Sequence, residues 1–220
     1  MPDVLQVSLD LIKFGAQGIT VHPRPDERHI RREDVYILKK NISSVEFNIE
    51  GYPSQEFIDM CCEVSPDQVT LVPDPPDAIT SNAGFVVSKQ AGLLSASIAK
   101  LKKSRVRVSV FVGNDLTQND FDFLKNTGCD RVELYTEDYA NSFGTSKQQE
   151  VVSQYVRTAQ MATHSSLGVN AGHDLNLKNL AFFKAHIPGL IEVSIGHALI
   201  CDALFFGLQQ TVQKYLTCLK

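Results

Sequence analysis

The chain has 220 residues, of which 43% are hydrophobic and 21% charged, a composition typical of a globular protein. Its 21 lysines and arginines against 25 aspartates and glutamates give a formal net charge of −4. This acidic balance argues against non-specific binding to nucleic acid, which needs a basic surface. The length predicts one domain over residues 1–220, and no apolar run reaches the ~20 residues that a membrane-spanning helix requires.

Strands and helices alternate along the chain. Residues 3–15 have the spacing of an amphipathic helix. Helical patterns with apolar side chains three or four residues apart then separate several short runs rich in β-branched residues. These runs predict strands at Ile19–His22, Val45–Glu50, Gln68–Val72, Arg107–Val112, Arg131–Tyr135, Gly168–Asn170 and Ile191–Ile195.

This alternation predicts an α/β fold with a parallel sheet. The strands read as continuous apolar runs more than as clean alternations, which is typical of parallel strands covered on both sides. A doubly wound sheet and a (β/α)8 TIM barrel both fit, but no G-x-G-x-x-G follows a strand, which weakens the doubly wound alternative. We therefore predict a barrel. Closing its eight strands requires one more strand before Asp3.

Acids and bases gather at the predicted ends of these strands. In a parallel barrel the C-terminal ends of the strands form one rim, where the active site lies. His22 and Glu50 end two of the strands, Glu133 lies within another, and His173 follows a fourth. Because imidazoles and carboxylates are the usual proton carriers near neutral pH, we predict an acid–base site at this rim.

Two segments of the same rim suit phosphate groups. Gly196 and His197 connect the last strand to a helix, where a glycine lets an anion approach the exposed backbone amides. Arg24 and His29 follow the first strand, and an arginine can hold a second anion through two hydrogen bonds.

Each of these residues also has a purely structural interpretation. Glu50 could be a carboxylate at the N-terminus of a helix, and Glu133 an inward charge paired with an arginine. Arg24 and Arg28 could belong to a solvated charged loop. A single histidine at a strand end more often packs or forms a hydrogen bond than it catalyses. The occurrence of all these groups together favours one shared site.

Five segments, taken together, resemble a known family. They are GITVHPRPDERHI (18–30), FNIE (47–50), LVPDPPDAITSNAG (71–84), VNAGHDLN (169–176) and IGHALI (195–200). The chain is similar here to the pyridoxine 5′-phosphate synthases of vitamin B6 biosynthesis, in order and over essentially its whole length. The resemblance implies a (β/α)8 barrel with extra helices that assembles into a homo-octamer and uses no organic cofactor and no catalytic metal.

The resemblance also implies a reaction and a set of residues. Its two phosphorylated substrates are 1-deoxy-D-xylulose 5-phosphate and 3-amino-2-oxopropyl phosphate, and its products are pyridoxine 5′-phosphate, phosphate and water. His22 and Glu50 match proton acceptors, His173 matches the proton donor, and Glu133 matches a carboxylate that stabilises a transition state. The substrate-binding positions that match are Arg24, His29 and Thr80 for the deoxyxylulose phosphate, and Asp174, Gly196 and His197 for the aminoketone phosphate.

The start of the chain departs from the family. The family has a first strand and a loop before the helix that begins here near Asp3, and this segment supplies polar residues and an arginine to both substrates. We expect a segment of roughly 15–25 residues, one strand with its loop, to be absent from this sequence. This expectation agrees with the count of seven strands.

Other functions remain open from the residues alone. A Schiff-base aldolase would need a lysine at a strand end, and none is found there. A metal-dependent hydrolase could use His22 and His173, although no H-x-H or H-E-x-x-H occurs. A non-catalytic protein that binds phosphorylated ligands is the third alternative. The five cysteines include no C-x-x-C pair, so we expect reduced thiols in a cytoplasmic protein and no zinc site.

Overall fold

A computed structural model describes residues 3–74 and 83–220 of the chain. All seven predicted strands are confirmed, each within two residues of its predicted bounds. They pair in parallel and in chain order, from β1 at one edge of the sheet to β7 at the other. The strands are β1 (Gly18–Val21), β2 (Glu46–Gly51), β3 (Gln68–Leu71), β4 (Arg107–Val112), β5 (Arg131–Tyr135), β6 (Gly168–Gly172) and β7 (Leu190–Ser194).

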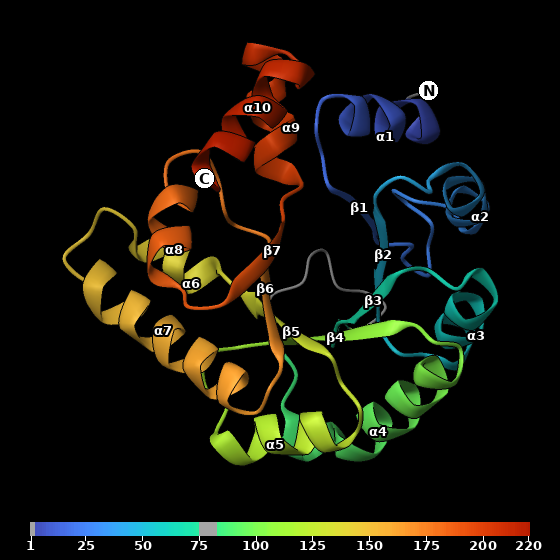
Figure 1. Cartoon of the computed structure of the whole chain (residues 1–220), viewed down its shortest axis with the longest axis vertical. Coiled ribbons are helices and arrows are strands. Elements are labelled where there is room, and N and C mark those ends of the chain that lie inside the picture. Colours follow the sequence, from blue (N-terminus) through green and yellow to red (C-terminus); the bar gives the residue numbers. More distant parts are fainter. Residues whose placement is uncertain (1–2, 75–82) are drawn as a thin grey trace.

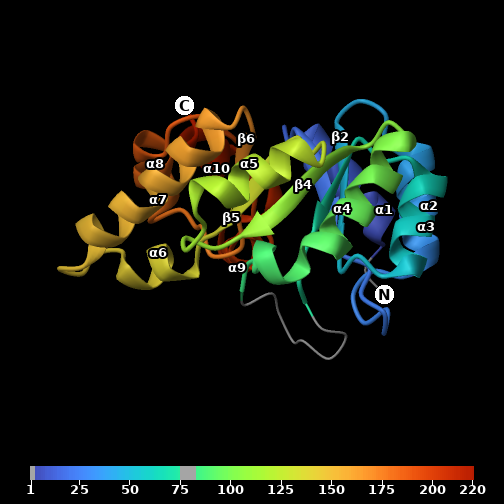
Figure 2. The same ribbon diagram turned by 90° about the horizontal axis from the view of Figure 1, so that it is seen from below.

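Helices surround this sheet on its outer side, as Figure 1 and Figure 2 show from two directions. The predicted amphipathic helix at the start of the chain is confirmed as α1. The helices are α1 (Val4–Lys13), α2 (Arg32–Asn41), α3 (Gln55–Val64), α4 (Val87–Lys103), α5 (Gln118–Asn126), α6 (Glu137–Ser142), α7 (Gln148–His164), α8 (Leu180–His186), α9 (His197–Phe206) and α10 (Leu208–Cys218).

Side-chain caps define where several helices begin. The Asp3 carboxylate accepts the backbone N–H of Gln6 at α1, and Ser54 does the same for Phe57 at α3. These caps satisfy amides that have no partner within the helix. The strand-to-helix turns are therefore set by short local motifs.

The strand register sorts the side chains into two sets. One set points outward to the helices and is apolar: Val108, Val110, Val132, Leu134 and Val169 are fully buried there. Full burial of each such side chain is worth about 1.5–3 kcal/mol. These contacts between sheet and helices form the core of the molecule.

The other set points into the barrel and is also largely buried, which confirms that these strands are covered on both sides. In the strand register, each residue of this set lies beside another residue of the set on a neighbouring strand. The set is largely polar because alternate residues of each strand share a face. Its members are Gly18, Thr20, Glu46, Asn48, Glu50, Gln68, Thr70, Arg107, Ser109, Phe111, Arg131, Glu133, Tyr135, Gly168, Asn170, Gly172, Glu192 and Ser194.

The sheet curves into a nearly closed barrel. Its edge strands approach each other, and the Thr20 Oγ1 of β1 lies 3.5 Å from the Ser194 Oγ of β7. Within the described residues no backbone ladder joins these two strands. The predicted α/β barrel of seven strands is thus confirmed.

The outer surface near this junction is less well covered than the rest. Ile191 of β7 is 59% exposed, and Leu204 and Phe205 of α9 are 81% and 84% exposed.

None of the helices in the described parts of the chain has the length and apolar character needed to cross a membrane.

Candidate active site

Two buried carboxyl groups lie inside the barrel, Glu50 on β2 and Glu133 on β5. Glu50 is 7% exposed and Glu133 is fully buried. The Thr70 hydroxyl lies 3.4 Å from Oε2 of Glu133 and 3.3 Å from Oδ1 of Asn48. Oε1 of Glu133 has no hydrogen-bond partner among the described residues. Glu133 thus sits in a site that offers little to stabilise a negative charge.

Burial governs the protonation of both groups. Burial, together with the negative charges of Glu192 and Asp74, raises the pKa of Glu50 from 4.5 to about 7, while Arg24 opposes the shift. Burial also raises the pKa of Glu133 well above 4.5, and Glu50 and Glu192 add to this effect. Near neutral pH, therefore, Glu50 is close to half-protonated, and the surroundings of Glu133 favour its protonated form.

The two predicted catalytic histidines stand at the same end of the barrel. His22 directly follows β1 and His173 directly follows β6. Burial lowers the pKa of each from 6.5 to about 4, and the charge of Arg24 acts on both. The two imidazoles also act on each other, because His173 contributes to the lowered pKa of His22. Both rings are therefore neutral at pH 7 and able to accept a proton.

His173 is held in an unusual conformation. Its φ of +86° lies in the left-handed region, which residues other than glycine rarely adopt. Its ring packs 4.9 Å from the ring of Phe111 and 6.1 Å from that of Tyr135, measured between centroids. Such backbone strain is typical of functional sites, and the aromatic contacts fix the direction of the imidazole.

The alternative interpretation of Arg24 as part of a solvated loop is wrong, because its side chain is buried at the rim of the barrel. Its Nη2 is 3.1 Å from Oδ2 of Asp74, which follows β3. Arg28 does fit the solvated-loop interpretation, since it pairs with Asp26 and both side chains are partly exposed. Asp74, which the sequence did not single out, brings a negative charge to Glu50 and to both histidines.

The remaining predicted residues are those that the family resemblance implies for substrate binding, and only some of them belong to the cluster. Asp174 and His197 belong to the cluster, because burial raises the pKa of Asp174 while His197 opposes the shift, and His197 also acts on His173. Gly196 is exposed and directly precedes α9. His29 is exposed in the loop before α2, and no contact among the described residues joins it to the cluster. Thr80 lies outside the described residues.

Neither structural interpretation of the two carboxylates fits the observed contacts. Glu50 does not cap a helix, because Ser54 caps α3. Glu133 does point inward, but the arginine below it is paired elsewhere: Nη1 of Arg131 is 2.7 Å from Oε2 of Glu192. The interpretation of Glu133 as half of an arginine pair is therefore wrong.

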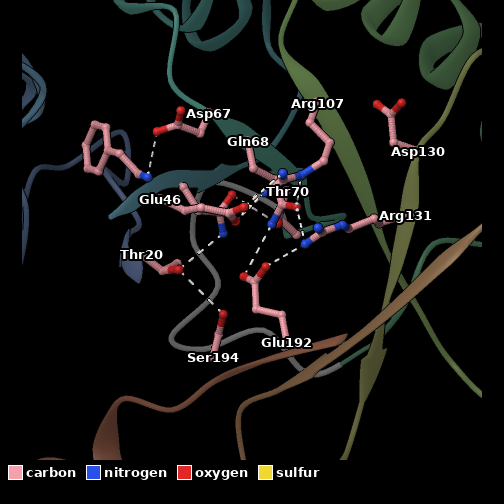
Figure 3. A network of polar contacts seen from close by, with 12 residues as sticks. Thr20, Glu46, Asp67, Gln68, Thr70, Arg107, Asp130, Arg131, Glu192 and Ser194 are labelled. Atoms are coloured by element: carbon pink, nitrogen blue, oxygen red, sulfur yellow. Dashed lines mark hydrogen bonds and ion pairs between the residues drawn. The ribbon is translucent and has the colours of Figure 1, made fainter. Parts of the chain in front are cut away.

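A polar network that was not predicted from the sequence joins inner-face residues at the start of several strands (Figure 3). Arg107 pairs with Glu46, and its Nε donates to Oε1 of Gln68 at 2.9 Å. The amide of Gln68 also reaches Glu192, at 3.5 Å. A signal was present in the sequence, because polar residues recur at every second position of β2, β3, β5 and β7. In residues 3–74 and 83–220, no group of three or more His, Cys, Asp and Glu is arranged to hold a metal ion.

The sheet topology and the site at its rim define an α/β barrel of the TIM type, and known structures agree. A 3-keto-L-gulonate-6-phosphate decarboxylase from Vibrio cholerae matches 96% of this chain and 88% of its own, with a TM-score of 0.65 and 12% identity. A phosphoribosylanthranilate isomerase from Thermotoga maritima matches 98% and 93%, with a TM-score of 0.61 and 14% identity. At such low identity the likeness shows the fold alone.

Sequence comparison defines the family. The family model described as "Pyridoxal phosphate biosynthesis protein PdxJ" matches residues 1–220. A pyridoxine 5′-phosphate synthase from Parabacteroides distasonis is 56% identical over 219 residues, and one from Cytophaga hutchinsonii is 54% identical over 219 residues. Each alignment covers 100% of this chain and 90% of the relative. The chain belongs to the PdxJ family, which confirms the resemblance seen in its motifs.

Proposed function

We propose that this chain is a pyridoxine 5′-phosphate synthase. It condenses 1-deoxy-D-xylulose 5-phosphate with 3-amino-2-oxopropyl phosphate and releases pyridoxine 5′-phosphate, phosphate and water. The names of the relatives support this proposal. The observation that carries it is the cluster of Glu50, Glu133, His22 and His173 at one mouth of the barrel, with burial adjusting the pKa of each group.

The reaction moves a proton at nearly every step. The amine attacks the ketone, water leaves to give a Schiff base and then an enamine, phosphate is eliminated, and ring closure with a second dehydration gives the pyridine ring. A group with a pKa near the working pH both accepts and returns protons well. Glu50, with a pKa of about 7, is suited to this shuttle role.

The two histidines take different parts. His22 is neutral and acts as a base beside the deoxyxylulose portion. His173 is also neutral in the free protein, and two bound phosphates would raise the pKa of its ring by adding negative charge nearby. His173 can then carry the proton that a departing hydroxyl requires.

Glu133 lies deepest in the site. Burial and the neighbouring carboxyl groups raise its pKa, which favours the protonated form in the free protein. When positive charge develops on the iminium carbon or nitrogen, Glu133 would pass its proton to the carboxylate of Glu50, and its own ionised form would then stabilise the charge. Glu133 thus matches a change of charge that occurs only during the reaction.

The phosphate groups would occupy two parts of the rim. Arg24 would bind the deoxyxylulose phosphate with His29 and Thr80, and it would then share its guanidinium with Asp74. Gly196 and His197 would bind the second phosphate at the start of α9, next to Asp174. Holding both ends converts an encounter of two molecules into an oriented reaction.

The chain would act as a homo-octamer in the cytoplasm. The exposed Leu204 and Phe205 of α9 support contacts between subunits, because side chains of this size are usually covered. The described cysteines are all free, which suits a reducing compartment.

Incubation of the chain with both substrates tests the proposal. Pyridoxine 5′-phosphate, followed by absorbance and mass, is the expected product. Glu50→Gln keeps the shape of the side chain but removes its basicity, so this variant should bind both substrates and give little product. The matched control is Glu150→Gln, which makes the same change at an exposed position of α7 and should react at the normal rate.

Three outcomes would contradict the proposal. Binding of both substrates by the unmodified chain without product would indicate a non-catalytic binding protein. Borohydride trapping of a substrate on a lysine would indicate an aldolase. Normal turnover by Glu50→Gln would remove this residue from the mechanism.

A further inference from the structure

The inner face of the barrel contains more acids than bases. Two arginines, Arg107 and Arg131, lie at the first positions of β4 and β5. Arg107 pairs with Glu46, and Arg131 pairs with Glu192 at 2.7 Å. Each arginine of this layer is therefore matched by one glutamate (Figure 3).

Glu133 stands one layer above this network, on the same strand as Arg131. They lie two positions apart along β5, so both side chains point into the barrel. Glu133 is nevertheless not paired with this arginine; its Oε2 receives the Thr70 hydroxyl, and its Oε1 has no partner among the described residues. The guanidinium of Arg131 points instead to Glu192 of β7 and to Oε1 of Gln68.

Strand β6 provides the space for this arrangement. It lies between β5 and β7, and Asn170 is in register with Glu133 on one side and Glu192 on the other. Glycines flank Asn170 on the inner face. A Cβ at Gly168 would come within 2.9 Å of Cγ of Arg131, and a Cβ at Gly172 would overlap Oε1 of Glu133.

We propose that the Glu192–Arg131 ion pair is a positioning pair for the active-site carboxyl groups: it holds the positive charge of Arg131 at the N-terminal end of the barrel and so leaves Glu133 with its proton. The inference relies on the proposed synthase function only for the use made of that proton. Glu192 would not contact substrate; it would act through Arg131 and through its own charge.

The surroundings of Glu133 are consistent with this role. Its register partners are Phe111 of β4 and Asn170 of β6, and the Thr70 hydroxyl of β3 donates to it. The charged groups that act on it are Glu50 of β2 and Glu192 of β7, and Arg131 and Tyr135 share its strand and its face. After burial, the negative charges of Glu50 and Glu192 raise the pKa of Glu133. Burial likewise raises the pKa of Glu192 itself, and Arg131 opposes that shift most strongly.

The signs of the expected effects follow from the charges. Glu192→Gln removes a negative charge and releases Arg131, so the pKa of Glu133 and of Glu50 should fall by about one unit. Arg131→Gln removes the positive charge and should therefore raise the pKa of both Glu133 and Glu50. The double variant removes both charges, and its carboxyl groups should therefore titrate as in the unmodified chain.

Two measurements on the full chain test the proposal. The first is a ¹³C NMR titration of the glutamate side-chain carboxyls in the ligand-free protein, with the Glu133 signal assigned by its loss in Glu133→Gln. The second is the pH profile of kcat with both substrates. Glu192→Gln should shift both curves to lower pH by about one unit, and the double variant Glu192→Gln/Arg131→Gln should restore both.

The outcomes separate this inference from the proposed function. A merely structural role predicts that the double variant is at least as perturbed as either single variant, and that result would overturn the proposal. A Glu133 titration in Glu192→Gln that coincides with the unmodified chain would also overturn it. If Glu192→Gln fails to fold, Arg131→Gln against the unmodified chain still decides, because the proposal predicts a raised pKa of Glu133 there and an unchanged titration would overturn it. Absence of product from the unmodified chain refutes the synthase function but leaves the NMR titration as a test of the pair.

Discussion

The outer and inner faces of the same seven strands are built from opposite kinds of side chain. On the outer face, residues such as Val110, Val132 and Leu134 are fully buried against helices. On the inner face, Glu50 and Glu133 are just as deeply buried but are acids with raised pKa values. Barrels of this type usually fill their interior with branched apolar side chains. The comparison teaches that the outer face supplies apolar contacts that stabilise the barrel, whereas the inner face holds the acids that we propose carry its chemistry.

Neighbouring residues of β5 give the strongest test of this difference. Leu134→Ala removes an outward side chain that is fully buried, so it should lower the free energy of unfolding by about 2–5 kcal/mol. Glu133→Gln replaces an inward buried acid, whose raised pKa favours the protonated form, by an amide; it should change stability by less than about 1 kcal/mol, while kcat falls about 100-fold or more. Urea unfolding and steady-state kinetics of the two variants measure both effects. Equal losses of stability would break the comparison.

The buried Glu50 should lower the free energy of unfolding at high pH. Because the pKa of Glu50 is raised from 4.5 to about 7 on folding, the stability it contributes is complete below pH 4.5 and is lost as the pH rises through 7. Glu50→Gln should therefore be more stable than the unmodified chain at pH 8, by about 2–3 kcal/mol, but not at pH 4.5. The opposite trend of His22 and His173, whose lowered pKa values cost stability as the pH falls from 6.5 to 4, cancels in this difference. Urea unfolding at the two pH values measures it, and a pH-independent difference would contradict the burial of Glu50 as an acid.

Gly172 sharpens the comparison, because it is a glycine that the inner face requires. An added Cβ would overlap Oε1 of Glu133 and lie 3.1 Å from the carbonyl oxygen of Ser194. Gly172→Ala should thus lower stability by about 1–3 kcal/mol and displace Glu133, with a fall in kcat larger than the change in KM. A variant with unchanged kcat would show that the position of Glu133 is not critical.

Substitution of Gly92 should have the smallest effect on the free energy of unfolding, and it should stabilise the chain. It lies in α4, outside the barrel, and a Cβ there would meet no atom within 4 Å. Gly92→Ala should raise the free energy of unfolding by about 0.5–1 kcal/mol, because alanine favours the helix, and kcat should not change. Thermal unfolding checks the first expectation. A loss of activity would mean that the two regions are coupled.

Much of the architecture was predictable, because strands and helices leave local signals. All seven strands and α1 could be located from short patterns of apolar residues. The polarity of the inner face was not recognised, since alternation in a run such as Arg107–Val112 is blurred by Phe111 and by small serine. Two histidines and two glutamates at or near strand ends were enough to suggest an acid–base site.

The pairings inside the site could not be predicted in the same way. Arg24 pairs with Asp74, fifty positions away, and Arg131 pairs with Glu192, sixty-one positions away. Such contacts depend on how the strands close into a barrel, which no local pattern states. The protonation of Glu50 follows from its burial and from these distant charges, so it too becomes visible only in the folded chain.

The central claim is that the inner face holds a buried acid prepared to exchange protons near neutral pH. A ¹³C NMR titration of the Glu50 side-chain carboxyl in the ligand-free chain, assigned by its loss in Glu50→Gln, measures this property directly. A midpoint at about pH 7 is the result expected from its burial and its neighbours. A midpoint near 4.5, the value of a solvated glutamate, would contradict the account.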